Sequence, residues 1–254
     1  LVAVNDLVPA DNLAFLLQYD TVYGRYSRSV EHGDSGLVID GQSYPLYSEK
    51  NPAELPWEKH DVDIVFECTG VFSKMEELRK HLDAGASWVL LSAPAKSPEV
   101  ATVVHGVNKP KNDDVPIVSC ASCTTNSITP VVEVMGRRIG VHKALMTTIH
   151  AYTSTQGIVD SPSSKFRRGH AAAANIIPTT TGAAGATTKA LPQFENKFDG
   201  VAVRVPVPVG SIVDLGMTRV VDGDLVKVMA WYDNEWGYSN QLIREARRIA
   251  KEKV

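Results

Sequence analysis

The sequence of 254 residues is poor in cysteine, nearly balanced in charge and free of long apolar runs. Its three cysteines, Cys68, Cys120 and Cys123, are too few for a disulfide framework and indicate a reducing compartment. The 26 basic and 29 acidic residues leave a net charge of −3, without the basic field that nucleic acids or membrane surfaces require. No signal-peptide pattern and no apolar run of about 18 residues is present, so we expect a soluble, cytoplasmic protein.

What is present is an ordinary globular composition with strand and helix patterns in alternation. Hydrophobic residues make up 44% of the chain and charged residues 22%, enough for one large or two modest domains. Because strand and helix alternate in the first half, we expect an α/β fold with a parallel sheet. The patterns predict strands at 1–6, 62–68 and 88–92, helices at 11–19 and 73–82, and a hairpin at 37–41.

The second half combines strand patterns with one helix start and one long polar loop. Strand 116–119 runs through a polar turn towards a helix at 128–139, which places Cys123 near a helix N-terminus and Pro130 in the first turns. The loop 154–170 is long enough to suggest a functional role. Further strands are predicted at 144–150, 200–207 and 225–232, and an amphipathic helix at 240–254.

Cys123 and His150 are a candidate nucleophile and base. A thiol reacts as its thiolate, so its pKa of about 8.5 must be lowered, and a helix N-terminus or a histidine can do this. Taken alone, a cysteine is more often a small core residue and a histidine a structural hydrogen-bonding group. Cys120 and Cys123 also form a C-x-x-C pair, which leaves thiol redox chemistry open. The other histidines do not provide the ligand spacing of a zinc site, so we expect no metal.

Five short segments carry a more specific signal than any single residue. They are SCTTN at 122–126, TTIHAYT at 147–153, IPTTTGAA at 177–184, RVP at 204–206 and WYDNEWGY at 231–238. Together and in this order they resemble the phosphorylating glyceraldehyde-3-phosphate dehydrogenases. The resemblance covers nearly the whole chain and implies a Rossmann-like parallel-sheet domain followed by an α+β catalytic domain with a mixed sheet.

The resemblance implies covalent chemistry at Cys123. The thiol would add to the aldehyde of glyceraldehyde 3-phosphate, with His150 as the base, and the resulting thioester would be cleaved by inorganic phosphate. Two anion pockets follow from the same resemblance, one with Thr153 and Arg204 for the substrate phosphate. The second, for inorganic phosphate, would use Ser122, Thr124, Arg168, Thr181 and Gly182. Hydroxyls, backbone amides and guanidinium groups are the donors that phosphate requires.

The resemblance also implies NAD as the cofactor. Asp6 would hold the adenosine ribose, where an acidic residue favours NAD over NADP. The remaining cofactor-binding residues would be Thr69, Gly70, Ser92, Asn234 and Tyr238. We further expect a homo-oligomer, a tetramer by resemblance, with loop 154–170 near a subunit interface.

The chain departs from the family pattern in two places. The ribose acid normally follows a glycine fingerprint by about 20 residues, yet here it is residue 6 and no G-x-G-x-x-G occurs anywhere. An internal segment of the catalytic domain is also missing near 210–216. Losing a central parallel strand should expose two sheet edges and uncover apolar faces, so we expect that the chain does not fold alone into a working enzyme. We expect an NAD-binding domain at 1–122, a catalytic domain at 123–237 and a helix at 238–254 that returns to the first domain.

Three other functions remain open on the sequence alone. Erythrose-4-phosphate dehydrogenase uses a similar site and differs in how the thioester is cleaved. A truncated, non-catalytic remnant would keep the fold without binding NAD. A thiol-redox protein would use both Cys120 and Cys123.

Overall fold

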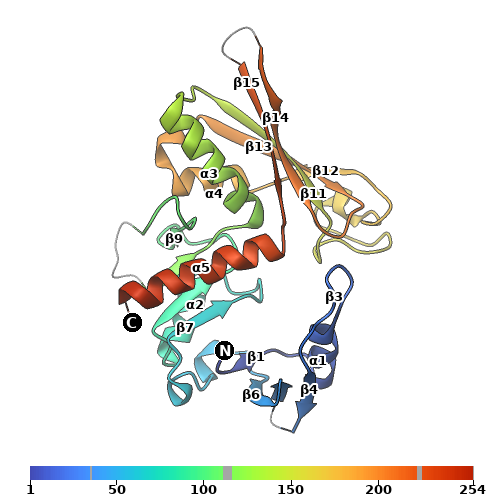
Figure 1. Ribbon diagram of the computed structural model, residues 1–254, viewed down its shortest axis with the longest axis vertical. Helices are drawn as coiled ribbons and strands as arrows, with labels where there is room; N and C mark the ends of the chain where they lie inside the picture. Colours follow the sequence, from blue (N-terminus) through green and yellow to red (C-terminus); the bar gives the residue numbers. More distant parts are fainter. Residues whose placement is uncertain (35, 111–115, 222–224, 254) are drawn as a thin grey trace. The chain divides into compact units, whose positions relative to one another are not determined.

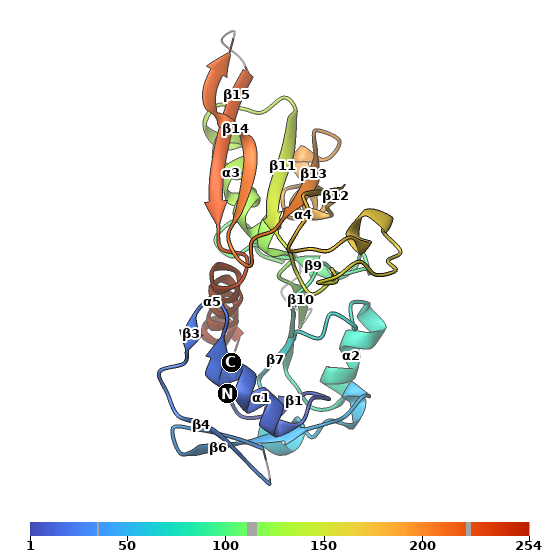
Figure 2. The same cartoon turned by 90° about the vertical axis from the view of Figure 1, so that its right-hand side faces the viewer.

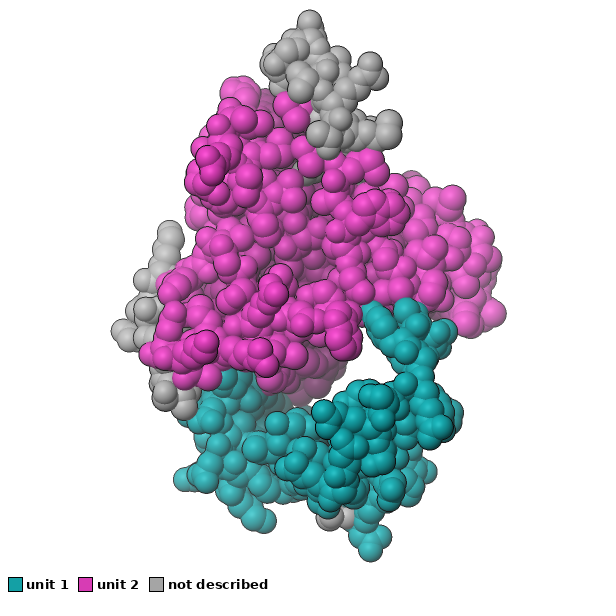
Figure 3. All heavy atoms as spheres, in the orientation of Figure 1, with its two compact units in different colours: residues 1–65, 76–89 teal, residues 66–75, 90–254 magenta. Residues whose placement is uncertain are grey.

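The computed structural model describes all residues except 35, 111–115, 222–224 and 254 (Figure 1). The chain divides into two compact units, drawn in different colours in Figure 3. Unit 1 comprises Leu1–Val65 and Glu76–Val89, and unit 2 comprises Phe66–Met75 and Leu90–Val254. The domain boundaries expected from the sequence stay a prediction.

Unit 1 contains a small mixed sheet and the helix α1 (Ala10–Gln18). Its strands lie in the order β1-β6-β5-β4, with β1 parallel to β6 and the other pairs antiparallel. The expected hairpin is present, because Asp40 and Gly41 both adopt the positive φ angles that a tight two-residue turn requires. The strands are β1 (Val4–Asn5), β4 (Val30–Gly33), β5 (Gly36–Ile39) and β6 (Gln42–Tyr47), with a short ribbon of β2 (Tyr19–Asp20) and β3 (Gly24–Arg25).

The core of unit 1 forms where two short 3-10 turns meet the end of helix α2 (Met75–Asp83). The turns are η1 (Pro52–Glu54) and η2 (Glu58–His60). The buried cluster is Leu55, Trp57, Val62, Val65, Ala84 and Ala86. The indole N–H of Trp57 donates to His81 Nδ1 over 3.1 Å, so these two buried polar groups are paired with each other.

A second sheet has the strand order β7-β8-β10-β9. β8 is buried at every residue and reads Trp-Val-Leu-Leu, and β10 is buried throughout as well, as expected for strands covered on both faces. β9 and β10 are parallel. The parallel-sheet prediction for the first half of the chain is confirmed. The strands are β7 (Ile64–Glu67), β8 (Trp88–Leu91), β9 (Ala101–Thr102) and β10 (Ile117–Ser119).

Unit 2 is built around a five-stranded mixed sheet in the order β12-β13-β11-β14-β15. β11 and β13 are parallel and the other pairs antiparallel, which confirms the mixed sheet of the catalytic half. Helices α3 (Cys123–Arg138) and α4 (Ala183–Ala190) cover one face (Figures 1 and 2). Their core with the sheet includes Ile128, Met146 and Phe198. The strands are β11 (Ala144–Ala151), β12 (Ile177–Thr180), β13 (Phe198–Val205), β14 (Ser211–Val221) and β15 (Leu225–Tyr232).

The helices of unit 2 differ from the sequence patterns mainly at their starts. They are α3 (Cys123–Arg138), α4 (Ala183–Ala190) and α5 (Trp236–Lys253), with turns η3 (Phe166–Gly169) and η4 (Pro192–Phe194). α3 begins at Cys123 itself, five residues before the predicted start, because the Ser122 side chain caps it. Pro130 therefore lies in the helix interior, and its predicted place in the first turns is wrong. The last predicted residue of α5, Val254, lies outside the described residues.

The expected join at 210–216 falls at the beginning of β14. This strand is continuous and pairs with both β11 and β15, with a register shift between Leu215 and Arg219. The five-stranded sheet therefore has no gap at the join.

Candidate active site

Cys123 is the first residue of α3, directly after a tight turn from β10. Ala121 in that turn adopts a left-handed φ of 56°. Ser122 is the N-cap, and its Oγ accepts a hydrogen bond from Thr125 N over 3.2 Å. The turn and the cap together place the thiol where the free backbone N–H groups of the first helical turn point.

His150 lies at the end of β11 on the face that the helices cover. Met146, Thr148 and His150 alternate with more exposed residues, as the two-residue period of a strand requires. The imidazole is 5% exposed, and its Nε2 lies 3.3 Å from Cys123 Sγ. The structure therefore brings together the two residues that the sequence named as nucleophile and base.

Arg204 stands beside the imidazole because it is the register partner of His150 on β13. His150 Nδ1 lies 2.7 Å from Ala151 O and 2.8 Å from Arg204 Nη1, which also donates to Ala151 O over 2.7 Å. With the proton on Nδ1, the ring donates to the carbonyl and leaves the Nε2 lone pair facing the thiol. With the proton on Nε2, Nδ1 accepts from Arg204 and the ring donates to the sulfur.

Burial sets the protonation states of the pair. It raises the pKa of the Cys123 thiol, and hydrogen bonds from Thr124 and the charge of Arg204 offset this only in part. Burial, followed by the Arg204 charge, lowers the pKa of His150 to about 4. The pair at rest is a thiol beside a neutral imidazole. The expectation that the helix N-terminus lowers the thiol pKa below its usual value is wrong, because desolvation outweighs it.

Tyr232 is a member of this site that the sequence reasoning left without a role. Its hydroxyl lies 2.7 Å from Thr124 Oγ1 and 3.1 Å from Thr148 Oγ1. The ring meets the His150 ring edge-on, with centroids 5.9 Å apart and planes at 74°. Its place in the WYDNEWGY segment was the one signal in the sequence that could have indicated a role. Its contacts could not be predicted from that segment, because they depend on the pairing of β14 and β15.

The residues expected to bind phosphate gather partly around the pair. Ser122 and Thr124 flank Cys123, and Thr181 and Gly182 cap α4, where Thr181 Oγ1 accepts from Ala183 N over 3.1 Å. Arg168, on η3, donates to Thr179 Oγ1 and to Thr180 O, each over 3.0 Å. Its charge also lowers the pKa of His150, so it acts on the same site. Thr153, in contrast, hydrogen-bonds Thr155 over 2.9 Å on an exposed segment.

The residues expected to bind the cofactor fall into two groups. Asn234 and Tyr238 belong to the site: Asn234 Oδ1 accepts from Gly210 N and Ser211 Oγ, and the Tyr238 hydroxyl donates to Ala121 O over 3.1 Å. Thr69, Gly70 and Ser92 follow the ends of β7 and β8, and Thr69 N–H donates to Glu67 Oε1 over 2.8 Å. Asp6 lies in unit 1 after β1, where its carboxylate accepts from Val8 N over 2.9 Å.

The other two cysteines, Cys68 and Cys120, are not part of the Cys123–His150 pair. Cys120 is 4% exposed, and burial together with the charge of Glu245 raises its pKa strongly. Cys68 is exposed, yet its pKa is also raised by desolvation. Within the described residues, no group of three histidine, cysteine or carboxylate side chains could hold a metal ion.

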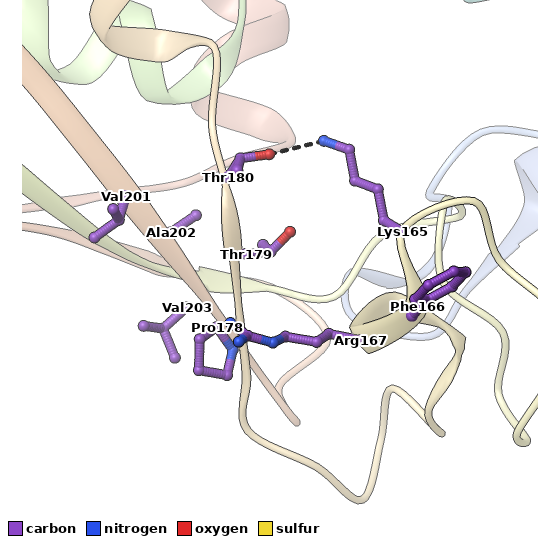
Figure 4. Close-up of a pocket in the computed structure, with 9 residues that line it drawn as sticks. All are labelled: Lys165, Phe166, Arg167, Pro178, Thr179, Thr180, Val201, Ala202 and Val203. Atoms are coloured by element: carbon purple, nitrogen blue, oxygen red, sulfur yellow. Dashed lines mark hydrogen bonds between the residues drawn. The ribbon is translucent and has the colours of Figure 1, made fainter.

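An open pocket of about 610 Å³ lies between η3, β12 and β13 (Figure 4). β13 contributes Val201, Ala202 and Val203 to its lining. Figure 4 shows Lys165 extending to Thr180, 2.9 Å away. Neither Cys123 nor His150 lines this pocket, but Thr179 and Thr180, to which Arg168 donates, do. Among the residues that the structure describes, no helix is long and apolar enough to cross a membrane.

Comparison with known proteins adds two family matches and close relatives. Residues 1–75 match the model of the glyceraldehyde 3-phosphate dehydrogenase NAD binding domain, and residues 122–219 match that of the C-terminal domain. The chain is 42% identical to glyceraldehyde-3-phosphate dehydrogenase 2 of Streptomyces avermitilis, over 96% of this chain and 88% of the relative. It is 40% identical to glyceraldehyde-3-phosphate dehydrogenase 1 of Bacillus subtilis, over 98% and 90%. The first alignment spans 297 positions, so the relative carries residues within the matched region that this 254-residue chain lacks.

Proposed function

Because this chain belongs to the glyceraldehyde-3-phosphate dehydrogenase family, we propose that it catalyses the NAD-dependent, phosphorylating oxidation of glyceraldehyde 3-phosphate to 1,3-bisphosphoglycerate. The observation that carries this proposal is the 3.3 Å approach of Cys123 Sγ to His150 Nε2 at the start of α3. A buried thiol facing a neutral imidazole is the arrangement that adds to an aldehyde and returns the proton.

The thiol and the imidazole share the first step. His150 has a pKa of about 4 and is neutral at pH 7, so its Nε2 can take the thiol proton as Cys123 Sγ bonds to the aldehyde carbon. The former carbonyl oxygen is stabilised by the Cys123 N–H and the imidazolium, which returns the proton to it and gives the thiohemiacetal hydroxyl. His150, neutral again, then accepts the hydroxyl proton as hydride leaves the adduct and the thioester forms.

Two sets of donors would bind the substrate phosphate and the inorganic phosphate. Arg204 is suited to the substrate phosphate, because its Nε is buried without a partner among the described residues while its Nη1 is held by Ala151 O. Thr153 would complete that pocket. Ser122, Thr124, Arg168, Thr181 and Gly182 would hold the inorganic phosphate that attacks the thioester.

The site also fits the nicotinamide end of NAD, which when bound supplies the hydride acceptor. Asn234 has its Oδ1 fixed by Gly210 N and Ser211 Oγ, so its Nδ2 group is left to donate to a carboxamide oxygen. Tyr238 is held by Ala121 O, two residues from the thiol. Thr69, Gly70, Ser92 and Asp6 would bind the rest of the cofactor.

A phosphate-dependence assay tests the proposal directly. Purified protein with glyceraldehyde 3-phosphate and NAD should form NADH at a rate that rises with inorganic phosphate. Erythrose 4-phosphate should be the poorer substrate, and preference for it without phosphate dependence would replace the assignment with erythrose-4-phosphate dehydrogenase. Cys123→Ser should abolish the reaction, whereas the matched variant Cys120→Ser should keep it. If both serine variants lose activity equally, the dithiol function gains support.

We also propose that the protein is a homo-oligomer, a tetramer by family resemblance. The sheet face opposite α3 and α4 is apolar and exposed, with Leu145 79%, Val201 56% and Trp231 75% exposed. Two such faces could pack on each other about a two-fold axis, as sheets do in sandwiches. A role in glycolysis and a cytoplasmic location are likewise proposed, and fractionation of the source cells tests the location.

A further inference from the structure

Tyr232 contacts the ring of His150 and the hydroxyl of Thr124, the residue that follows Cys123. It is the last residue of β15, and its register partner on β14 is Ser211. Through Thr124 its hydroxyl contacts the first turn of α3, and through Thr148 it contacts β11 two residues before His150. One side chain thus joins the element that carries the nucleophile to the strand that carries the base.

The hydrogen-bond directions around Tyr232 follow from what each group can donate. Thr124 gives both its backbone N–H and its hydroxyl to the Cys123 sulfur, and these bonds favour the thiolate. A threonine hydroxyl that donates to sulfur has lone pairs left to accept. The Tyr232 O–H, 2.7 Å away, can donate to it and accept from Thr148 in turn. Burial raises the pKa of Tyr232 to about 12, so its proton is retained at neutral pH.

We propose that Tyr232 is a positioning residue whose hydroxyl orients Thr124 to donate to the Cys123 sulfur, while its ring fixes the plane of the His150 imidazole. Chained hydrogen bonds strengthen one another, so the phenol makes Thr124 a better donor to the developing thiolate. The proposal deepens the proposed function. It rests on that function only in taking the Cys123 thiolate as the nucleophile of the reaction.

The phenol also limits how the imidazole can move. An edge-to-face contact at 74° holds the ring plane, while Ala151 O and Arg204 fix its Nδ1 end. Removing only the hydroxyl should therefore leave the His150 contact in place. Tyr232→Phe separates the two roles, because the ring stays and the hydrogen bonds are lost.

The test is the pH dependence of Cys123 alkylation by iodoacetamide, followed on the peptide that carries Cys123 by mass spectrometry. This readout needs no substrate or cofactor, so it is independent of whether the dehydrogenase assay succeeds. In Tyr232→Phe we expect alkylation at pH 7 to slow about tenfold and its apparent pKa to rise by about one unit. The matched control Tyr26→Phe removes a hydroxyl from an exposed tyrosine in unit 1 and should behave as wild type.

A double variant distinguishes one chain of hydrogen bonds from two separate effects. Thr124→Val should slow alkylation as Tyr232→Phe does, and the double variant should be no slower than the slower single variant. Additive losses, or a wild-type profile in Tyr232→Phe, would overturn the proposal. If circular dichroism shows that Tyr232→Phe does not fold, Thr124→Val alone decides. This variant lacks the hydroxyl that Tyr232 is proposed to orient, so an unchanged pH profile of alkylation in it would overturn the proposal.

Discussion

At the scale of single residues, the site consists of ordinary groups whose protonation is set by burial. His150 is 5% exposed and lies beside a guanidinium, so the charged imidazolium is disfavoured in the folded protein. Arg204 and Ala151 O hold the ring from one side, and Cys123 faces it from the other. The thiolate is formed during the reaction rather than stored, because the resting thiol has a raised pKa.

The His150 pKa predicts how the stability of the protein depends on pH. In the unfolded chain His150 takes up a proton near pH 6.5, whereas the folded protein resists it until about pH 4. Between these values the unfolded state binds more protons, so the free energy of unfolding falls as pH is lowered, by at most about 3 kcal/mol from this group. The measurement is urea unfolding at several pH values between 7 and 4.

The matched variant isolates this effect from other titrating groups. His150→Asn removes the titration and should flatten the slope of unfolding free energy against pH between 6.5 and 4. His142→Asn, outside the site, should keep the wild-type slope. Identical slopes for wild type and His150→Asn would contradict the assigned pKa.

At the scale of elements, the sequence predicted what is local and missed what depends on distant pairing. The strand patterns predicted β11 and β13, and the polar turn around Cys123 indicated a helix start nearby, because these features arise within one segment. Pro130 was placed wrongly because a helix that starts at Cys123 puts it in the interior, where tertiary packing overrides its cost. Tyr232 was missed because its partners Thr124 and Thr148 are 108 and 84 residues away.

The N-cap of α3 makes the first prediction for an element. Ser122→Ala removes the acceptor of the Thr125 N–H and should lower the free energy of unfolding by about 1 kcal/mol. It should also slow Cys123 alkylation, since the thiol sits on the same turn. Ser122→Thr keeps a hydroxyl acceptor and is the matched control. Equal stability of the alanine and threonine variants in urea unfolding would show that the cap contributes nothing.

The turn after α2 makes the second prediction. Gly85 has a φ of 106°, and a Cβ there would lie 2.5 Å from Glu58 Cβ and 2.6 Å from its backbone nitrogen. Gly85→Ala should therefore cost about 2 to 4 kcal/mol by thermal or urea unfolding. Gly106→Ala is the control, because Gly106 also has a positive φ of 82° but open space around it. Its cost should stay near about 1 kcal/mol.

At the scale of the whole molecule, the sequence predicted the two kinds of sheet but not every strand pairing. The alternation of strand and helix predicted the parallel sheet, and the resemblance carried by the order of motifs implied the mixed sheet. That β14 bridges β11 and β15 was not predictable, because a two-sided pairing is decided by long-range register rather than by local pattern.

The open sheet face predicts how the protein associates. Val201→Asp places a charge in the middle of the apolar face and should weaken self-association at least tenfold, because a buried unpaired carboxylate is costly. Sedimentation velocity over a concentration series measures this. Val134→Asp alters an exposed apolar residue on α3 and should leave the assembly unchanged. Unchanged association of the Val201 variant would place the interface elsewhere.

Covalent trapping at Cys123 tests the central claim most directly. The protein is incubated with glyceraldehyde 3-phosphate and NAD in phosphate-free buffer, quenched in acid, digested and analysed by mass spectrometry. We predict a 3-phosphoglyceryl thioester on the peptide that contains Cys123, lost when inorganic phosphate is added before the quench and absent in His150→Asn at the same early time. An acyl group on Cys68 or Cys120, or NADH formed without any acylated cysteine, would contradict the account.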